Sequence, residues 1–148
     1  MGDATLSIAR SGLDVERQRM EVIAQNLANA GTTRTATGES YRPLRLVSGP
    51  RIGTTFAEHM QPGATPVGQT MTGVQSYGIE QVDAAPRRVY DPAHPHADAN
   101  GFVTYPGLDH AGEMSLMVQT LRSYEAGTVM FNAARTMYLR ALDLGNRS

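Results

Sequence analysis

The chain has 148 residues with 13 basic and 14 acidic side chains, no Trp, no Cys and only 6% aromatic residues. This length fits one domain, and the short supply of large apolar side chains excludes an extensive core. The missing cysteines exclude a disulfide scaffold, and the net charge of -1 leaves no broad positive field for nucleic acid. Apolar runs are too short for a membrane span or a secretory signal. We therefore expect no direct membrane insertion and no cleaved signal peptide.

The first predicted element is a long helix in an N-terminal segment of residues 1–31. Asp3 is placed to cap its start, and Gly31 is expected to end it in the left-handed conformation. Apolar residues recur every seven positions in one stripe, at Leu6, Leu13, Met20 and Leu27. A second stripe, nearly opposite on the helical wheel, contains Ile8, Val15 and Val22. One packed face cannot bury both stripes, so this helix is expected to contact other molecules as well.

The middle segment, residues 32–111, contains all eight prolines and is expected to consist of loops and short strands. Alternating apolar residues predict strands at 44–47 and 74–82. Asn100-Gly101, directly before a third apolar run at 102–105, indicates a hairpin. The Gly- and Pro-rich residues 49–73 are interpreted as loop or partly disordered chain.

A second long helix is predicted in the C-terminal segment, residues 112–148, with Asp109 or His110 before it and Gly145 as its stop. Its second half is apolar around almost the whole circumference, and such a helix must be buried on all sides. The chain has too little other apolar material for this, so neighbouring molecules are expected to cover it. If the two helices pair within a monomer, the second stripe of the first helix is expected to face water.

The fold class that follows is mainly α. The long N- and C-terminal helices are expected to pack as a coiled-coil-like pair or bundle, flanking an irregular middle of loops and short β strands.

One group of metal-ligand residue types occurs in the second half of the middle segment and at the start of the C-terminal segment. Its members are Asp91, His94, His96, Asp98, Asp109, His110 and Glu113. Two prolines interrupt the strand that would align the histidines, and no HExxH, nucleotide-binding or nucleophile motif occurs. We predict no catalytic residue, no cofactor and no metal site. A small metal-dependent hydrolase built on His94, His96 and His110 remains the least favoured alternative.

Several short motifs resemble a known family. Ser11-Gly12-Leu13, Arg19, Asn26-Leu27-Ala28-Asn29-Ala30 and Tyr41-Arg42 resemble the N-terminal signature of bacterial flagellar axial proteins. Val89-Tyr90-Asp91-Pro92, His94-Pro95, Ala97-Asp98, Gly101-Phe102-Val103 and Pro106 are similar to the segment before the last helix in proximal rod proteins. Arg122 to Ala126, Asn132, Met137 and Leu142 to Gly145 resemble the last helix of those proteins. Gly107 and Gly127 depart from the family pattern, which commonly has Asn at both positions.

The resemblance implies a structural subunit of the proximal rod in the flagellar basal body, polymerising helically into the drive shaft around the export channel and required for motility. It implies homo- and hetero-oligomeric contacts with other copies, with paralogous proximal and distal rod proteins and with the adaptor between the MS ring and the rod. Export through the flagellar type III apparatus is implied as well. A helical adaptor or export chaperone is the main alternative.

The predicted subunit interface follows from the apolar stripes together with this resemblance. We expect it to contain Leu6, Leu13, Met20, Ile23, Asn26, Leu27, Asn29, Met114, Leu121, Tyr124, Phe131, Met137 and Leu142. Asn26 and Asn29 are included because amides buried in a helical bundle need specific partners and could fix the register between subunits.

Overall fold

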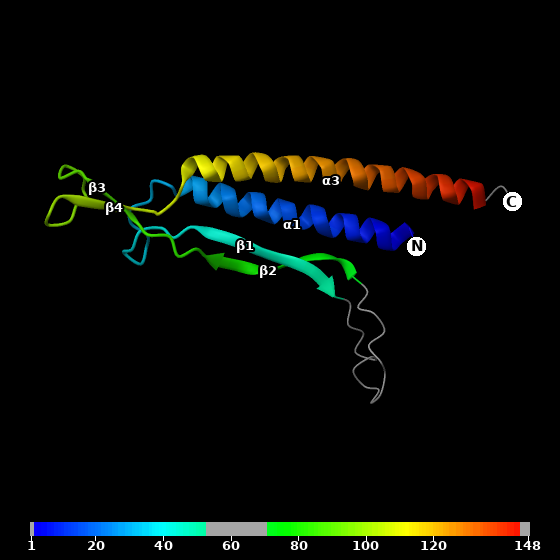
Figure 1. Ribbon diagram of the computed structural model, residues 1–148, viewed down its shortest axis with the longest axis horizontal. Helices are drawn as coiled ribbons and strands as arrows, with labels where there is room; N and C mark the ends of the chain where they lie inside the picture. The colour runs from blue at the N-terminus through cyan, green and yellow to red at the C-terminus, as the bar shows by residue number, and fades with distance from the viewer. Residues whose placement is uncertain (1, 53–70, 146–148) are drawn as a thin grey trace, which may run out of the picture. The chain divides into compact units, whose positions relative to one another are not determined.

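The computed structural model describes residues 2–52 and 71–145. In these residues the elements are helix α1 (Gly2–Ala28), strands β1 (Leu44–Ile52), β2 (Met71–Gln81), β3 (Arg87–Tyr90) and β4 (Phe102–Tyr105), and helix α3 (His110–Gly145). β1 pairs with β2 and β3 pairs with β4 in separate two-stranded sheets (Figure 1). The expected fold class, two long terminal helices with short strands and loops between them, is confirmed.

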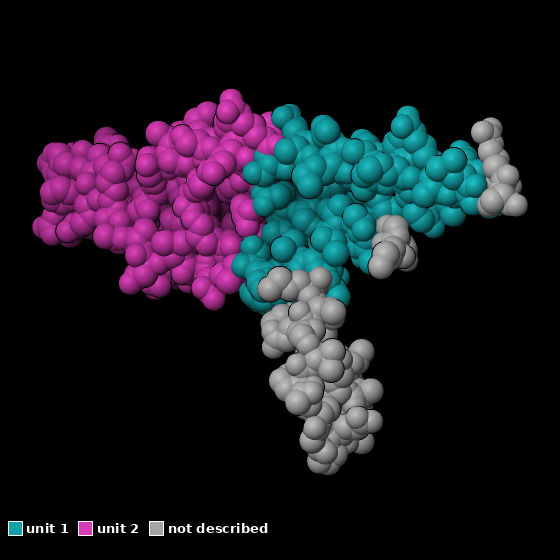
Figure 2. Space-filling view, turned by 45° about the vertical axis from the view of Figure 1, so that its right-hand side comes forward, with its two compact units in different colours: residues 1–17, 48–77, 123–148 teal, residues 18–47, 78–122 magenta. Residues whose placement is uncertain are grey.

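The chain divides into two compact units, coloured separately in Figure 2. Unit 1 contains residues 1–17, 48–77 and 123–148, and unit 2 contains residues 18–47 and 78–122. Each long helix therefore contributes one half to each unit.

Unit 2 is built around the end of α1 and the beginning of α3, which lie side by side and run in opposite directions (Figure 1). Its buried apolar side chains include Val22 and Ile23 of α1 and Val103 of β4. The backbone carbonyl of Asp109 accepts the amide of Glu113, and the Asp109 side chain lies over Gly112, so Asp109 caps α3 as expected. This small core holds the loops and the hairpin of the unit against the helices.

The β3–β4 hairpin of unit 2 has an antiparallel register in which Val89 lies opposite Val103. Its connection runs from Asp91 to Gly101, so it is wider than the tight Asn-Gly turn that the sequence indicates. The Asp98 carboxylate organises the turn, since Oδ1 accepts the amides of Asn100 and Phe102, both at 2.9 Å. Gly101 has a φ of 77°, which favours glycine. The hairpin is present, and a side chain rather than a two-residue turn shapes its end.

Unit 1 joins the beginning of α1 to the sheet through a buried serine. Ser11 Oγ donates to the carbonyl of Ile8 at 2.7 Å and accepts the amide of Val74 at 3.1 Å. A Cβ on Gly73 would come within 2.3 Å of this hydroxyl, and Gly73 has a φ of 122°. Glycine is therefore required where β2 approaches the helix.

Three local expectations are wrong. α1 begins at Gly2, so Asp3 lies inside the helix, and Gly31 is not left-handed because the chain leaves α1 through a turn in which Thr32 N bonds Asn29 O. Residues 49–52 and 71–73 belong to strands instead of a loop, since β1 and β2 extend to them. The rest of that predicted loop, residues 53–70, lies outside the described residues.

A further error concerns the second α1 stripe. Val15 and Val22 are only 5% and 4% exposed, whereas Ile8 is 44% exposed. Two of the three residues expected to face water are therefore among the most buried in the chain. Helical periodicity showed two apolar faces and could not decide which of them packs inside the chain.

Candidate assembly surface

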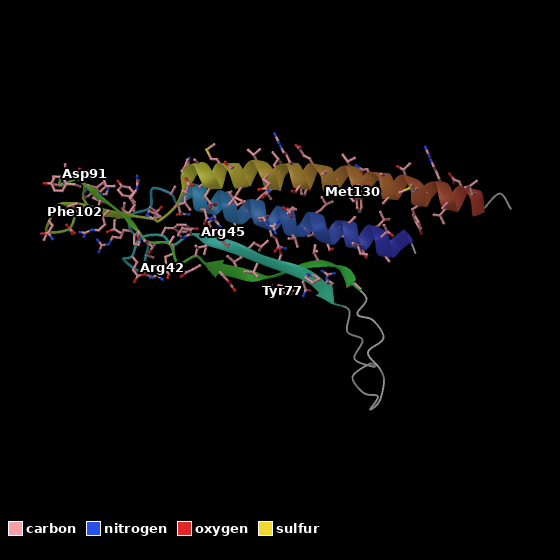
Figure 3. The ribbon with its side chains drawn as sticks, in the orientation of Figure 1. Arg42, Arg45, Tyr77, Asp91, Phe102 and Met130 are labelled. Carbon is pink, nitrogen blue, oxygen red and sulfur yellow. The ribbon has the colours of Figure 1, made fainter. Side chains whose placement is uncertain are left out.

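The second half of α3 belongs to unit 1 and carries the largest concentration of exposed apolar side chains. No residue between 123 and 145 is buried. We define the distal α3 surface as its exposed large apolar residues, namely Val129, Met130, Met137, Tyr138, Leu139, Leu142 and Leu144. Met130 and Leu144 are 70% and 72% exposed, and Met130 is marked on α3 in Figure 3. Patches of this kind on soluble proteins mark interaction sites.

Packing within unit 1 explains why so much of this half is left open. The helices of this unit approach closely at Gly127, where an added Cβ would lie 2.9 Å from Leu13 Cδ2. A single neighbouring helix can cover only one side of α3, whereas the apolar residues of its second half surround the axis. The side of α3 that turns away from α1 therefore has no cover in the described part of the chain.

The first half of α3 is different because two of its polar residues are buried in unit 2. Glu113 is 2% exposed and Thr120 is 4% exposed. Four apolar residues of this half remain exposed, namely Met114, Leu116, Val118 and Leu121. This half therefore contributes buried polar side chains to unit 2 and also exposes apolar ones.

A buried amide lies at the centre of unit 2. Asn26 of α1 has no exposed surface. Its Nδ2 donates to the carbonyl of Leu44 at 2.9 Å and to Glu113 Oε2 at 3.0 Å. Its Oδ1 accepts the hydroxyl of Tyr41 at 2.9 Å and the amide of Leu44 at 2.8 Å. Both donors and both acceptor positions of the amide are filled, which is the full capacity of an asparagine side chain.

The charge of Glu113 is balanced in the same place. Its Oε1 forms an ion pair with Arg45 Nη2, and Arg45 Nη1 also donates to the carbonyl of Leu44 at 3.0 Å. Burial, and to a lesser extent the negative charge of Glu113, raises the pKa of Tyr41 above its ordinary value of 10.0. We call Asn26, Tyr41, Leu44, Arg45 and Glu113 the Asn26 cluster. It connects α1, β1 and α3 within unit 2.

The residues predicted for the subunit interface fall into three groups. Met114, Leu121, Met137 and Leu142 are exposed on α3, at 45% to 65%. Leu6, Leu13, Met20, Leu27, Asn29, Tyr124 and Phe131 are partly buried. Ile23 and Asn26 are buried inside unit 2, so in this conformation neither is accessible to another molecule. Asn29 bonds locally, because its Nδ2 donates to the carbonyl of Gln25 and its Oδ1 accepts Thr32 Oγ1.

Other residues of the site were not singled out from the sequence as a cluster. In the sequence, Tyr41 is part of a family motif only. Arg45 lies in a predicted strand, and Glu113 belongs to the candidate metal-ligand group. A signal was available for Glu113, since a carboxylate in the first turn of a mainly apolar helix needs a partner or solvent. Ser11 had a similar signal, as a polar residue on the helix side that also carries Val15.

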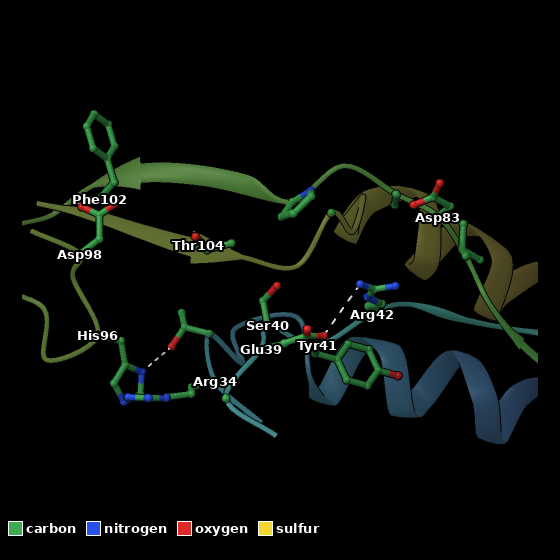
Figure 4. Close-up of a pocket in the computed structure, with 16 residues that line it drawn as sticks. Arg34, Glu39, Ser40, Tyr41, Arg42, Asp83, His96, Asp98, Phe102 and Thr104 are labelled. Carbon is green, nitrogen blue, oxygen red and sulfur yellow. Dashed lines mark hydrogen bonds and ion pairs between the residues drawn. The ribbon is translucent and has the colours of Figure 1, made fainter. Parts of the chain in front are cut away.

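A depression of about 550 Å³ lies in unit 2 between the loop at 33–42, the connection at 82–86 and the β3–β4 hairpin (Figure 4). Both charge signs line it, with Arg34, Arg42, Glu39, Asp83 and Asp98 among its residues. Thr33 Oγ1 and His96 Nδ1, 2.8 Å apart, tie the loop to the hairpin connection. Its lining therefore shows no single charge sign that would select an anionic or cationic ligand.

Two of the three histidines considered for a metal site, His94 and His96, bond to other groups. His94 Nδ1 accepts the amide of His96 at 3.0 Å, and the two rings meet edge to face with centroids 5.4 Å apart. Among residues 2–52 and 71–145, no group of three or more His, Asp or Glu side chains is arranged to hold a metal ion. In the same described residues, neither helix is long and apolar enough to cross a membrane.

The class of this protein follows from its similarity to known proteins. Residues 6–34 match the family described as "Flagella basal body rod protein". The flagellar basal-body rod protein FlgC of Bacillus subtilis is 36% identical, with 95% of this chain and 96% of that protein covered. The FlgC proteins of Salmonella typhimurium and Borreliella burgdorferi are 36% and 32% identical, with 93% and 94% of both chains covered.

The chain therefore belongs to the family of the flagellar basal-body rod protein FlgC. It is a structural subunit of the rod and localises to the flagellar basal body. The expectation drawn from the motifs at Ser11, Asn26 and Tyr90 is confirmed. These relatives are structural rod proteins that form part of a larger flagellar assembly.

Proposed function

We propose that the distal α3 surface is the main lateral contact through which this subunit polymerises in the proximal rod. One observation carries the proposal: none of residues 123–145 is buried, although seven large apolar side chains in this range are at least 38% exposed. At about 25 cal/mol per Å² of buried apolar surface, covering such side chains is a strong driving force for association. Rod assembly supplies the cover that unit 1 does not provide.

The proposed contact joins different surfaces of two subunits. The half-buried α1 stripe of Leu6, Leu13, Met20 and Leu27 retains exposed area that the α3 helix of another subunit can cover. A contact between two different surfaces does not close on itself, so repetition produces an open helix of subunits. This arrangement suits a tubular shaft, and it makes the protein a structural subunit without a catalytic role.

We further propose partners beyond other copies of this chain. The exposed apolar residues of the first half of α3, including Met114 and Leu121, extend the available contact surface. Paralogous proximal and distal rod proteins, the adaptor at the MS ring and the flagellar type III export apparatus would bind the same terminal helices. The exposed and partly buried members of the predicted interface remain the residues assigned to these contacts.

Met130→Glu tests the proposed surface, with Met130→Leu as the matched control. The glutamate would bury an unpaired charge in the subunit contact and should abolish swimming and rod assembly. In the purified monomer the side chain is 70% exposed, so the helix content and solubility should not change. The leucine variant should swim normally because it keeps the apolar volume. Normal swimming by the glutamate variant would contradict the proposal.

A further inference from the structure

The two terminal helices have more than one way to pack together. α1 offers two apolar stripes, one through Met20 and Leu27 and the other through Val15 and Val22. Apolar contacts are not directional, and a shift of seven residues along a helix moves it by about 10 Å while restoring a similar pattern. The apolar residues alone therefore do not specify which side of α1 turns toward the rest of the chain, or at which position.

The hydrogen bonds of the Asn26 cluster are directional, so they can specify the side and position of α1 that the apolar residues leave open. The Asn26 amide bonds the Leu44 backbone through both its N–H and its carbonyl oxygen, as a neighbouring strand would. Its second N–H reaches Glu113, whose other oxygen holds Arg45. Three elements are thus joined at one point, and every hydrogen-bonding position of the amide is occupied.

A displaced arrangement would lose these bonds while keeping much of the apolar burial. It would leave the amide of Asn26 and the carboxylate of Glu113 in an apolar environment without partners. A buried polar group without a hydrogen-bond partner destabilises the fold, and an unpaired carboxylate does so more than an amide. A single buried asparagine selects one register in coiled coils by the same physical effect.

We propose that the Asn26 cluster fixes the register of α1 against α3 and β1. It turns Val22 and Ile23 inward and so leaves the stripe of Met20 and Leu27 partly accessible to neighbouring subunits. Asn26 and Glu113 are then positioning residues for the assembly surface. The last step, from register to assembly, rests on the proposed function, whereas the register itself does not.

Two paired substitutions test this role. Asn26→Asp places a carboxylate beside Glu113 Oε2 and removes the N–H that the Leu44 carbonyl accepts, so it should broaden or shift the register and abolish swimming. In the double variant Asn26→Asp with Glu113→Gln, the glutamine amide can donate to the new carboxylate at position 26, and its carbonyl oxygen can still accept Arg45. The Leu44 carbonyl remains without its donor, so the double variant should recover the native register and swimming in part. A double variant no better than the single one would overturn the proposal.

Spin labels report the register directly in the full chain. Because the chain has no cysteine, Ala24→Cys and Gln119→Cys give one labelled site on each helix of unit 2, and both positions are exposed. The native sequence should show one narrow distance, and the double variant should show a larger population at that distance than Asn26→Asp does. Asn26→Asp should show a broad distribution or a second population displaced by about 10 Å. A narrow, unshifted distance in Asn26→Asp would overturn the register role.

An apolar variant keeps the test decisive if Asn26→Asp fails to fold. Asn26→Leu with Glu113→Met leaves no buried unpaired charge, and such replacements often preserve stability. We expect it to remain helical while its spin-label distances divide between registers. A single native distance would overturn the proposal. Shifted distances with normal swimming would uphold the register role and contradict the assembly surface. Native distances with lost swimming would contradict the register role and leave the assembly surface standing.

Discussion

The two halves of α3 are parts of one continuous helix, yet they are stabilised in different ways. Residues 110–122 bury Glu113 and Thr120 in unit 2, and Glu113 completes a saturated polar cluster. Residues 123–145 bury nothing and expose Val129, Met130 and Leu144 at about 70%. The polar half is thus specified by contacts within the chain, whereas the apolar half has no buried residue of its own, and we propose that assembly covers it. Directional hydrogen bonds can select one arrangement within the chain, whereas apolar surface can be covered by any suitable neighbour.

The largest effect is expected from deleting the end of the second half of α3. Deleting residues 135–148 should abolish rod assembly and swimming, because most of the distal α3 surface is lost. The same deletion should leave the unfolding of unit 2 nearly unchanged, since residues 135–145 bury no side chain. Isolation of basal bodies and thermal unfolding of the monomer measure the two effects.

A control for this deletion separates apolar area from charge. Changing Arg135, Arg140, Asp143 and Arg147 together to Ala in the full-length chain removes the charged side chains of the segment and keeps its apolar residues. This variant should still assemble. Assembly by the truncated chain itself would show that the distal α3 surface is dispensable.

The next effect is expected in the covered half. Glu113→Ala leaves the Nδ2 of Asn26 without one acceptor and removes the ion pair of Arg45. The free energy of unfolding should fall by about 1–3 kcal/mol. Denaturant unfolding of the monomer measures it, and Glu125→Ala, at an exposed position in the other half, is the matched control. Equal effects from the two substitutions would remove the distinction between the halves.

Substitution of one glycine in each unit should have a smaller effect on stability, and the two effects should differ. A Cβ on Gly107 would lie 2.3 Å from the backbone oxygen of Ala85 in unit 2, whereas a Cβ on Gly127 meets only the tip of the Leu13 side chain in unit 1. Gly107→Ala should therefore destabilise the chain by about 1–3 kcal/mol, because backbone must move. Gly127→Ala should change stability by less than about 1 kcal/mol, since the gain in helix propensity offsets the shift of Leu13. Opposite ranking of the two melting temperatures would contradict this comparison of the units.

The smallest effect concerns the hairpin of unit 2 at low pH. Hydrogen bonds from the amides of Phe102 and Asn100, aided by Arg88, lower the pKa of Asp98 below its ordinary value of 3.8. A lowered folded-state pKa means that the stabilisation is present above pH 3.8 and is lost as the pH falls further. The NMR signals of Tyr90 and Phe102 should shift in that range. Asp98→Asn should remove the pH dependence, and an unchanged titration in this variant would contradict the assignment.

The sequence predicted the parts of the fold that depend on periodicity and local chemistry. Both long helices, the cap at Asp109 and the strands near residues 44 and 74 follow from such patterns. Helical periodicity also showed that the second half of α3 is apolar around almost its whole circumference, which is more than one neighbouring helix can cover. The family motifs at Ser11 and Asn26 identified the family without explaining what their side chains do.

What the sequence could not predict are contacts between distant residues. Asn26 and Glu113 are 87 positions apart, and no local pattern indicates that one amide would bond β1 and α3 together. For the same reason, Val15 and Val22 pack inside although the helical wheel predicts that they face water. A helical wheel shows a face but not its partner. The sequence likewise cannot tell whether the partners of a buried Asn26 lie in the same chain, and in unit 2 they do.

The most direct test of the central claim is the accessibility of a thiol at position 130. Met130→Cys introduces the only cysteine of the chain, at a position that is 70% exposed in the monomer. The purified monomer should react rapidly with a polar maleimide, and isolated basal bodies from a swimming Met130→Cys strain should react at least ten times more slowly. Equal labelling of the monomer and the assembled rod would show that no neighbouring subunit covers this surface, which would contradict the account.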